Sequence, residues 1–191
     1  RFFDSNALAG LRLVVYEHSA VGRDLMVEIL SALGADVIRS GRSDRFIPVD
    51  TEAVEDAAGL ARLVREHRAD ALVSTDGDSD RPLLLDAQGA IVRGDVLGVL
   101  AARALGVRSI AIPVSCNSMA ELCGCFTQIV RTPIGSPWVI AGMQEMDDPG
   151  SVAGFEANGG FLTGSSIHRG TKVLPALPTR DCLLPVLAAL E

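Results

Sequence analysis

Short apolar runs alternate along the chain with stretches in which hydrophobic residues recur every three or four positions. The short runs predict buried strands, and the periodic stretches predict amphipathic helices. Strands joined by helices in this way are typical of an α/β protein with a largely parallel sheet. In chain order we expect a strand over 11–16, a helix over 25–33, a strand over 35–39, a helix over 54–64, a strand over 71–75 and a hairpin over 83–92.

The same pattern starts again after the hairpin. We expect a helix over 96–105, a strand over 109–114, a short helix near 118–122, a strand near 126–131, a short helix behind Trp138, two strands around Gly154–Gly160 and a last helix from Arg180. Asp50 or Thr51 is expected to cap the helix over 54–64, and Asp95 the helix over 96–105. We place the boundary near Val92 and predict two consecutive three-layer α/β/α domains with mixed, mostly parallel sheets, residues 1–92 and 93–191.

Composition and charge exclude several classes of protein. Of the 191 residues, 48% are hydrophobic and 21% are charged, which excludes a disordered or collagen-like chain. The apolar run over 182–190 is about half of the roughly 20 residues that cross a bilayer, so no membrane span is expected. A net charge of −7 repels phosphate backbones and anionic lipid, so nucleic acid is not an expected partner.

The number and spacing of the cysteines indicate the redox environment of the protein. Four cysteines in a chain of this size do not make a disulfide framework, which suggests a reducing environment, and we expect a cytoplasmic protein. Cys123 and Cys125 are separated by a single residue and therefore lack the spacing of zinc ligands. We interpret the cysteines as small buried hydrophobic residues.

An acidic loop follows the strand predicted over 71–75. Its sequence is Asp76-Gly77-Asp78-Ser79-Asp80-Arg81, with three carboxylates on alternate positions of a tight turn. Their charges raise one another's pKa unless a positive charge neutralises them. A hard divalent cation does this, and three side-chain ligands leave coordination positions open for water or a substrate phosphate. The aspartates are therefore candidate ligands of Mg²⁺ or Ca²⁺.

The same residues allow other interpretations of this loop to be tested against its sequence. An EF-hand is excluded, because the sixth position from Asp76 is Arg81 instead of glycine and the twelfth is Ala87 instead of glutamate. A phosphatase of the haloacid dehalogenase type also has Asp-x-Asp after a strand, but it expects Thr or Val at Asp80 and a later lysine, and the only lysine is Lys172. A solvated turn in which Arg81 neutralises the acids is the third alternative.

A glycine-rich segment in the second half of the chain is the other candidate site. It runs from Gly154 to Gly160 between two predicted strands, and its glycines allow the backbone to turn sharply beside a ligand. Glu156 and Asn158 can point the same way, so that a carboxylate and an amide accept from and donate to vicinal hydroxyls of a sugar. The alternative is a plain hairpin turn with Asn158 in the left-handed region.

Together the two segments resemble the α-D-phosphohexomutase family, which includes phosphomannomutases and phosphoglucomutases. The acidic loop matches, at every fixed position, the magnesium-binding Asp-Gly-Asp-x-Asp-Arg loop of the family's second domain. Glu156 and Asn158 fall on the acid and the small polar residue of the Gly-Glu-x-Ser-Gly sugar-binding loop of the third domain. The similarity extends to 11–34, 114–115 and 132–135, so it covers nearly the whole chain.

The resemblance implies an activity and roles for individual residues. A phosphorylated serine would transfer its phosphoryl group to a hexose 1- or 6-phosphate, and the bisphosphate would reorient and return the other phosphoryl group. Mg²⁺, held by the three aspartates, would bridge the serine phosphate to the acidic loop, while Arg81 would be the catalytic residue that orients the phosphoserine. Glu156 and Asn158, with Gly135 and Ser136, are expected to bind the hexose phosphate substrate.

The similarity covers only the middle of the family's four-domain architecture. The Ser-His-Asn-Pro type motif of the first domain and the Ser-Gly-Thr-rich phosphate-binding loop of the fourth are not found in this sequence. We therefore expect N- and C-terminal domains of the same protein as partners, and no turnover by this chain alone. Ser115 and Ser136 occupy positions where family members carry ionisable residues, and neither hydroxyl is a good general base without an activator. The alternative function is a non-catalytic module that binds a phosphosugar or a cation.

Overall fold

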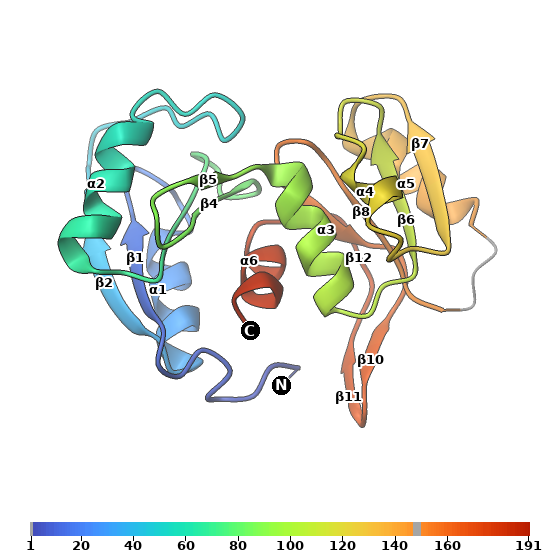
Figure 1. The fold of residues 1–191 in the computed structure, drawn as a ribbon, viewed down its shortest axis with the longest axis horizontal. Helices are drawn as coiled ribbons and strands as arrows, with labels where there is room; N and C mark the ends of the chain where they lie inside the picture. The colour runs from blue at the N-terminus through green and yellow to red at the C-terminus, as the bar shows by residue number, and fades with distance from the viewer. Residues whose placement is uncertain (1, 147–149) are drawn as a thin grey trace. The chain divides into compact units, whose positions relative to one another are not determined.

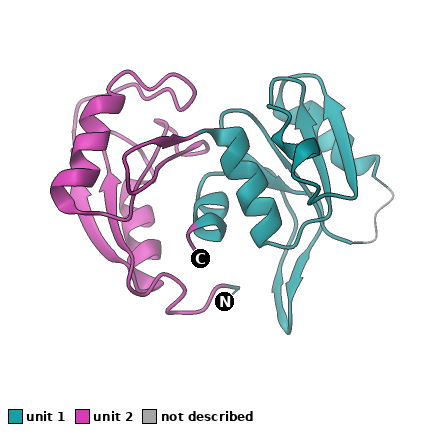
Figure 2. Cartoon of the chain, in the orientation of Figure 1, with its two compact units in different colours: residues 1–2, 93–189 teal, residues 3–92, 190–191 magenta. Residues whose placement is uncertain are grey.

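The computed structural model describes residues 2–146 and 150–191. They form two compact units, coloured in Figure 2: an N-terminal unit of Phe3–Val92 with the last two residues of the chain, and a C-terminal unit of Arg93–Ala189 with Phe2. Each unit contains one five-stranded sheet with helices packed on it. The predicted fold class, two α/β domains with mixed sheets, is confirmed.

The N-terminal unit alternates strands and helices and ends in antiparallel strands. Its elements are β1 (Arg12–Tyr16), α1 (Arg23–Ala32), β2 (Asp36–Ser40), α2 (Ala57–His67), β3 (Ala71–Thr75), β4 (Pro82–Leu85) and β5 (Ile91–Val92). The strand order is β2-β1-β3-β4-β5; β1 pairs in parallel with β2 and β3, and the other two pairings are antiparallel. Because the order reverses at β1, α1 and α2 lie on opposite faces (Figure 1). The loops that leave β1 and β3 meet at this reversal, where α/β sheets commonly bind ligands.

The helix α2 shows how a sequence pattern places one face of this core. Leu60 and Val64 of α2 pack with Val14 and Leu72 in one buried apolar cluster. The predicted cap at Asp50 or Thr51 is wrong, because the helix begins at Ala57 and is capped by Asp56, whose side chain accepts a 2.9 Å hydrogen bond from the Gly59 amide. Asp50 instead accepts from the Glu52 amide in a local turn of the irregular segment before the helix.

The C-terminal unit repeats the arrangement with a longer antiparallel part. Its elements are α3 (Gly94–Ala104), β6 (Ser109–Pro113), α4 (Met119–Leu122), β7 (Gln128–Thr132), α5 (Ser136–Gln144), β8 (Val152–Phe155), β9 (Phe161–Thr163), β10 (Ile167–Arg169), β11 (Lys172–Leu174), β12 (Leu177–Asp181) and α6 (Leu183–Leu190). The sheet order is β12-β9-β8-β6-β7, with β6 parallel to β7 and β8. The strands β10 and β11 form a separate two-stranded ribbon, visible in Figure 1.

Two helix starts differ from the prediction. Asp95 does not cap α3 from outside; it lies within the first turn, 1% exposed, and its carboxylate accepts from the amides of Val96 and Asn117 at 2.9 Å each. Asp95 therefore ties α3 to the turn before α4. The last helix does not start at Arg180, which belongs to β12; it starts at Leu183, and Asp181 accepts from the Leu183 amide at 2.8 Å.

Close packing explains the position of the helices on this second sheet. Val139 and Met143 of α5 pack with Ala111 and Leu162 in one apolar cluster. Gly98 of α3 lies so close to the Phe155 ring that a Cβ atom there would be 2.3 Å from a ring carbon.

The cysteines are only partly as expected. All four are free thiols; Cys116 and Cys182 are buried, but Cys123 and Cys125 are half-buried. Among the described residues, no helix combines the length and apolar character that a membrane crossing requires.

Candidate functional site

The acidic loop lies between the buried end of β3 and the start of β4. Each of Asp76, Asp78 and Asp80 places a carboxylate oxygen within 4.8 Å of the other two. Asp76 is buried, Asp80 half-buried and Asp78 exposed, so the cluster opens from the core toward the surface. The structure therefore brings together the three residues that were predicted as metal ligands.

Asp76 is the fixed member of the cluster. One carboxylate oxygen accepts a 2.5 Å hydrogen bond from Arg81 Nε, and the other accepts from the amides of Asp80 and Arg81 at 3.2 Å each. Burial alone would raise the pKa of Asp76, but the hydrogen bonds from Arg81 and from Asp78 outweigh it and lower the pKa. Arg81 Nε also lies 3.5 Å from Asp80, so this arginine neutralises part of the negative charge.

Asp78 experiences the opposite effect. Its pKa is raised, first through its contact with Asp76 and then by the charges of Asp76 and Asp80. Two carboxylates on opposite sides of one Mg²⁺ or Ca²⁺ are about 4 to 5 Å apart, given metal–oxygen distances of about 2.0 to 2.6 Å. A donor set of three carboxylates within 4.8 Å therefore fits a hard divalent cation, which would relieve the repulsion at Asp78.

A cavity of about 540 Å³ opens onto this loop. Its walls include Asp76, Asp78 and Arg81, together with Val21 and Phe46, whose side chains are strongly exposed. The cavity is large enough to admit a group that approaches the aspartates from solvent.

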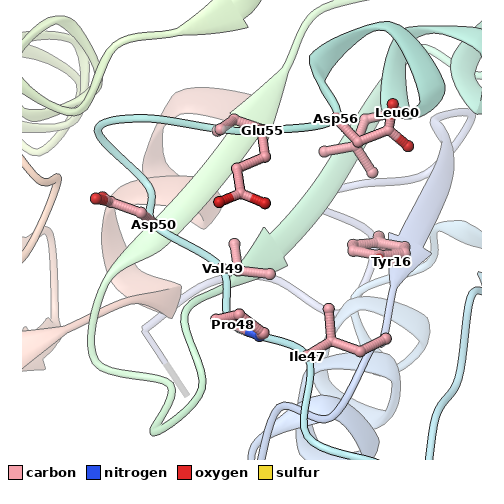
Figure 3. Close-up of a pocket in the computed structure, with 9 residues that line it drawn as sticks. Tyr16, Ile47, Pro48, Val49, Asp50, Glu55, Asp56 and Leu60 are labelled. Atoms are coloured by element: carbon pink, nitrogen blue, oxygen red, sulfur yellow. The ribbon is translucent and has the colours of Figure 1, made fainter.

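A second, smaller pocket of about 170 Å³ shares part of the same wall. Figure 3 shows the Tyr16 ring at one side of it, with Val49 and the carboxylate of Glu55 on the side of the irregular segment. Pro48, Val49 and Asp50 line both cavities, so this segment separates the small pocket from the aspartate loop.

In the C-terminal unit, Glu156 follows β8 and its side chain is only 7% exposed. Its Oε2 accepts a 2.7 Å hydrogen bond from the hydroxyl of Ser136, the first residue of α5. Gly135 precedes this residue with a φ of 121°, a conformation that favours glycine. Three of the four residues predicted to bind substrate, Gly135, Ser136 and Glu156, therefore come together.

Asn158 is placed differently. Its Oδ1 accepts a 3.0 Å hydrogen bond from the Gly160 amide, which closes a local turn. The alternative, a hairpin turn, is correct in part: β8 and β9 pair antiparallel on either side of the loop, but Gly159, with a φ of 89°, takes the left-handed conformation in place of Asn158. The side-chain carbonyl of Asn158 therefore stabilises the loop, in addition to any contact with a ligand.

Sequence reasoning missed Arg180. Its guanidinium lies 3.9 Å from Glu156, and its Cδ is so close to Gly160 that a Cβ atom there would be 2.6 Å away. The sequence around it suggests a helix start, and no local spacing links it to Glu156. Only the strand β12, whose residue Asp181 pairs with Phe161, brings Arg180 to the loop.

Known proteins share both units. The family description "Phosphoglucomutase/phosphomannomutase, alpha/beta/alpha domain II" matches residues 2–89, and the corresponding domain III matches residues 93–191. A phosphomannomutase of Sinorhizobium fredii is 49% identical over 97% of this chain and 40% of its own length. A phosphomannomutase of Salmonella muenchen is 46% identical over 96% of the chain and 39% of its own length.

Solved structures show the same fold at low identity. A phosphoglucomutase/phosphomannomutase family protein of Burkholderia thailandensis superposes with a TM-score of 0.74 at 18% identity, over 95% of this chain and 39% of that one. The Aspergillus fumigatus N-acetylphosphoglucosamine mutase, solved in complex with GlcNAc-6P and magnesium, gives 0.59 at 17% identity, over 97% of this chain and 44% of that one.

Proposed function

We infer the function of this chain from its family, since the chain belongs to the phosphoglucomutase/phosphomannomutase family, whose domains II and III it matches over nearly its full length. The chain spans about two fifths of the length of the relatives described above. We propose that it is the central part of a phosphohexomutase that interconverts hexose 1-phosphate and hexose 6-phosphate through a phosphoserine and Mg²⁺. The phosphoserine and the remaining phosphate contacts belong to N- and C-terminal domains of the same protein.

The observation that carries this proposal is the aspartate cluster, three carboxylates whose oxygens lie within 4.8 Å of one another. Asp76, Asp78 and Asp80 hold the ion, and the Aspergillus relative solved with magnesium supports this identity. Bound Mg²⁺ supplies positive charge that stabilises the transferring phosphoryl group.

Arg81 has two tasks in this proposal. It fixes Asp76 through the 2.5 Å hydrogen bond from Nε, which leaves the far end of its guanidinium for the incoming phosphate. Its side chain is 36% exposed and lines the 540 Å³ cavity beside the aspartates, so a phosphoserine that enters this cavity can reach it.

The loop around Glu156 binds the hydroxyls of the sugar. Ser136 donates to Glu156 and so directs one carboxylate oxygen, while the second oxygen remains available to accept from a hydroxyl. Asn158 contributes a neighbouring amide. Hydroxyls that look alike in both orientations of the bisphosphate allow one loop to serve both half-reactions.

The test uses the full-length protein with a hexose bisphosphate activator. We expect mutase activity toward hexose phosphates and its loss in Asp78→Asn, with the fold retained. An intact, phosphorylated protein without mutase activity would favour the alternative, a module that binds a phosphosugar or a cation without catalysis. Hydrolysis of a phosphoester in place of isomerisation would favour a phosphatase.

A further inference from the structure

The loop between β1 and α1, residues 17–22, is hydrogen-bonded to the backbone of the aspartate loop. The carbonyl oxygen of Thr75 accepts from His18 Nε2 at 2.9 Å. Two residues later, the carbonyl oxygen of Gly77 accepts from the Val21 amide at 3.1 Å. These two carbonyls flank Asp76, and both are directed toward the β1–α1 loop.

The carbonyl between them is engaged within the aspartate loop itself. The backbone carbonyl oxygen of Asp76 accepts hydrogen bonds from Thr75 Oγ1 at 2.8 Å and from the Ser79 amide at 3.3 Å. Three successive backbone oxygens, those of residues 75–77, are therefore already occupied by donors of the protein.

Ser79 holds the turn against the β1–α1 loop. Its φ of 63° lies in the left-handed region, and its Oγ accepts from the Gly22 amide at 2.9 Å and lies 3.0 Å from Thr75 Oγ1. The two loops approach so closely that a Cβ atom on Gly22 would be 2.9 Å from the Ser79 Cβ. The position between the second and third aspartates is thus fixed by contacts from outside the loop.

The β1–α1 loop is itself held in place. The His18 ring is fully buried and stacks on Tyr16 with 5.5 Å between the ring centroids. The His18 carbonyl accepts from the Ser43 amide at 2.9 Å and from Arg23 at 3.2 Å. A loop anchored at this residue and bonded to the aspartate loop resists rearrangement of the latter.

These contacts bear on which cation the site takes. Ca²⁺ needs six to eight oxygen ligands and commonly recruits backbone carbonyls, whereas Mg²⁺ keeps several waters and needs only one or two carboxylates besides a phosphate. We propose that the β1–α1 loop makes the site selective for Mg²⁺ over Ca²⁺, with His18 and Ser79 as positioning residues that withhold the carbonyls of residues 75–77. This inference rests on the proposed metal site.

The test compares Mg²⁺ and Ca²⁺ affinities of the 191-residue chain by calorimetric titration. His18→Phe removes the ring nitrogen that donates to the Thr75 carbonyl and keeps an aromatic ring beside Tyr16. Ser74→Ala is the matched control. Ser74 lies on β3, next to Thr75, and its hydroxyl donates a 2.7 Å hydrogen bond to the Tyr16 carbonyl of β1. This bond does not involve the aspartate loop. The ratio of the two dissociation constants is measured on one sample, so a partly unfolded fraction cancels.

We expect His18→Phe to reduce the preference for Mg²⁺ over Ca²⁺ by about tenfold, because the freed Thr75 carbonyl can turn toward the larger ion. Ser74→Ala should leave the preference unchanged. An unchanged ratio in His18→Phe, or an equal fall in Ser74→Ala, overturns the inference while leaving the metal site intact. A wild-type chain that binds neither ion overturns the proposed metal site itself.

Discussion

The hydroxyl of Ser136 donates a 2.7 Å hydrogen bond to Oε2 of Glu156, and this bond joins the start of α5 to the loop after β8. Glu156 is nearly buried, so the direction of its carboxylate depends on few partners. The guanidinium of Arg180 lies 3.9 Å from the same carboxylate. The geometry gives Ser136 the task of orienting Glu156, since a serine hydroxyl without an activating base is a poor proton acceptor.

Replacing Ser136 should therefore affect substrate binding more than turnover. We expect Ser136→Ala to raise KM of the full-length enzyme about tenfold with kcat changed less, because a hydrogen bond to a carboxylate is worth about 1.5–3 kcal/mol. Ser151→Ala removes a comparable 2.9 Å bond, to the Gly106 carbonyl, and should leave KM unchanged. A fall in kcat with unchanged KM would assign Ser136 to proton transfer instead.

Replacing Asp76 and replacing Asp78 should have different effects on thermal stability in the absence of metal. Asp76→Asn is expected to destabilise the chain by about 1–3 kcal/mol, because it weakens the buried hydrogen bonds with Arg81. Asp78→Asn should leave the unfolding temperature unchanged or higher, because it removes the repulsion that raises the pKa of this exposed residue. Equal destabilisation by both variants would mean that Asp78 also has a structural role.

Gly94 packs closely against the loop around Glu156, which we propose binds the sugar, and this packing gives another prediction. A Cβ atom at this position would lie 2.3 Å from the Gly159 amide nitrogen and 2.4 Å from the Ala157 carbonyl oxygen. We expect Gly94→Ala to displace the loop, destabilise the chain by about 1–3 kcal/mol and weaken hexose phosphate binding. Leu100→Ala, on the same helix but 38% exposed, is the control for helix stability. Unaltered sugar binding in Gly94→Ala would argue against a fixed loop.

A pH dependence follows from the pair of Arg131 and Glu121. The guanidinium donates to both carboxylate oxygens, at 2.8 and 2.9 Å, and holds the pKa of Glu121 below its usual range. A lowered folded-state pKa stabilises the fold above the ordinary glutamate pKa, and this contribution is lost as the pH falls through the lowered value.

We therefore expect Glu121→Gln to destabilise the chain at pH 7 by less than about 1 kcal/mol, since the pair is partly exposed. The difference from wild type, measured by denaturant unfolding, should disappear in acid below the lowered pKa. A difference that persists there would come from packing and not from the charge.

The sequence predicts the order of elements well where hydrophobic periodicity is strong, as in β1 and β3, which are largely buried. Sequence patterns do not predict a strand that contains few buried apolar residues. The ribbon of β10 and β11 includes His168, Arg169 and Lys172, and the edge strand β12 is mostly exposed, so neither resembles a buried strand. The caps at Asp56 and Asp95 depend on which nearby amides each carboxylate meets, which spacing alone does not determine.

The candidate site divides in the same way. The three aspartates and Glu156 can be identified from the sequence because each belongs to a compact local motif. The partners that position them are remote in sequence, since Gly22 meets Ser79 across 57 residues and Arg180 reaches Glu156 through a strand pairing. Contacts of this kind become visible only when the sheet order is known.

The most direct test of the central claim, that the aspartate loop holds a divalent cation, is calorimetric titration of Mg²⁺ into the 191-residue chain and into Asp78→Asn. The account predicts one ion per wild-type chain and at least about a tenfold loss of affinity in the variant, because one of three carboxylate ligands is neutralised. Equal affinity in both proteins, or no binding by a folded wild-type chain, would contradict it.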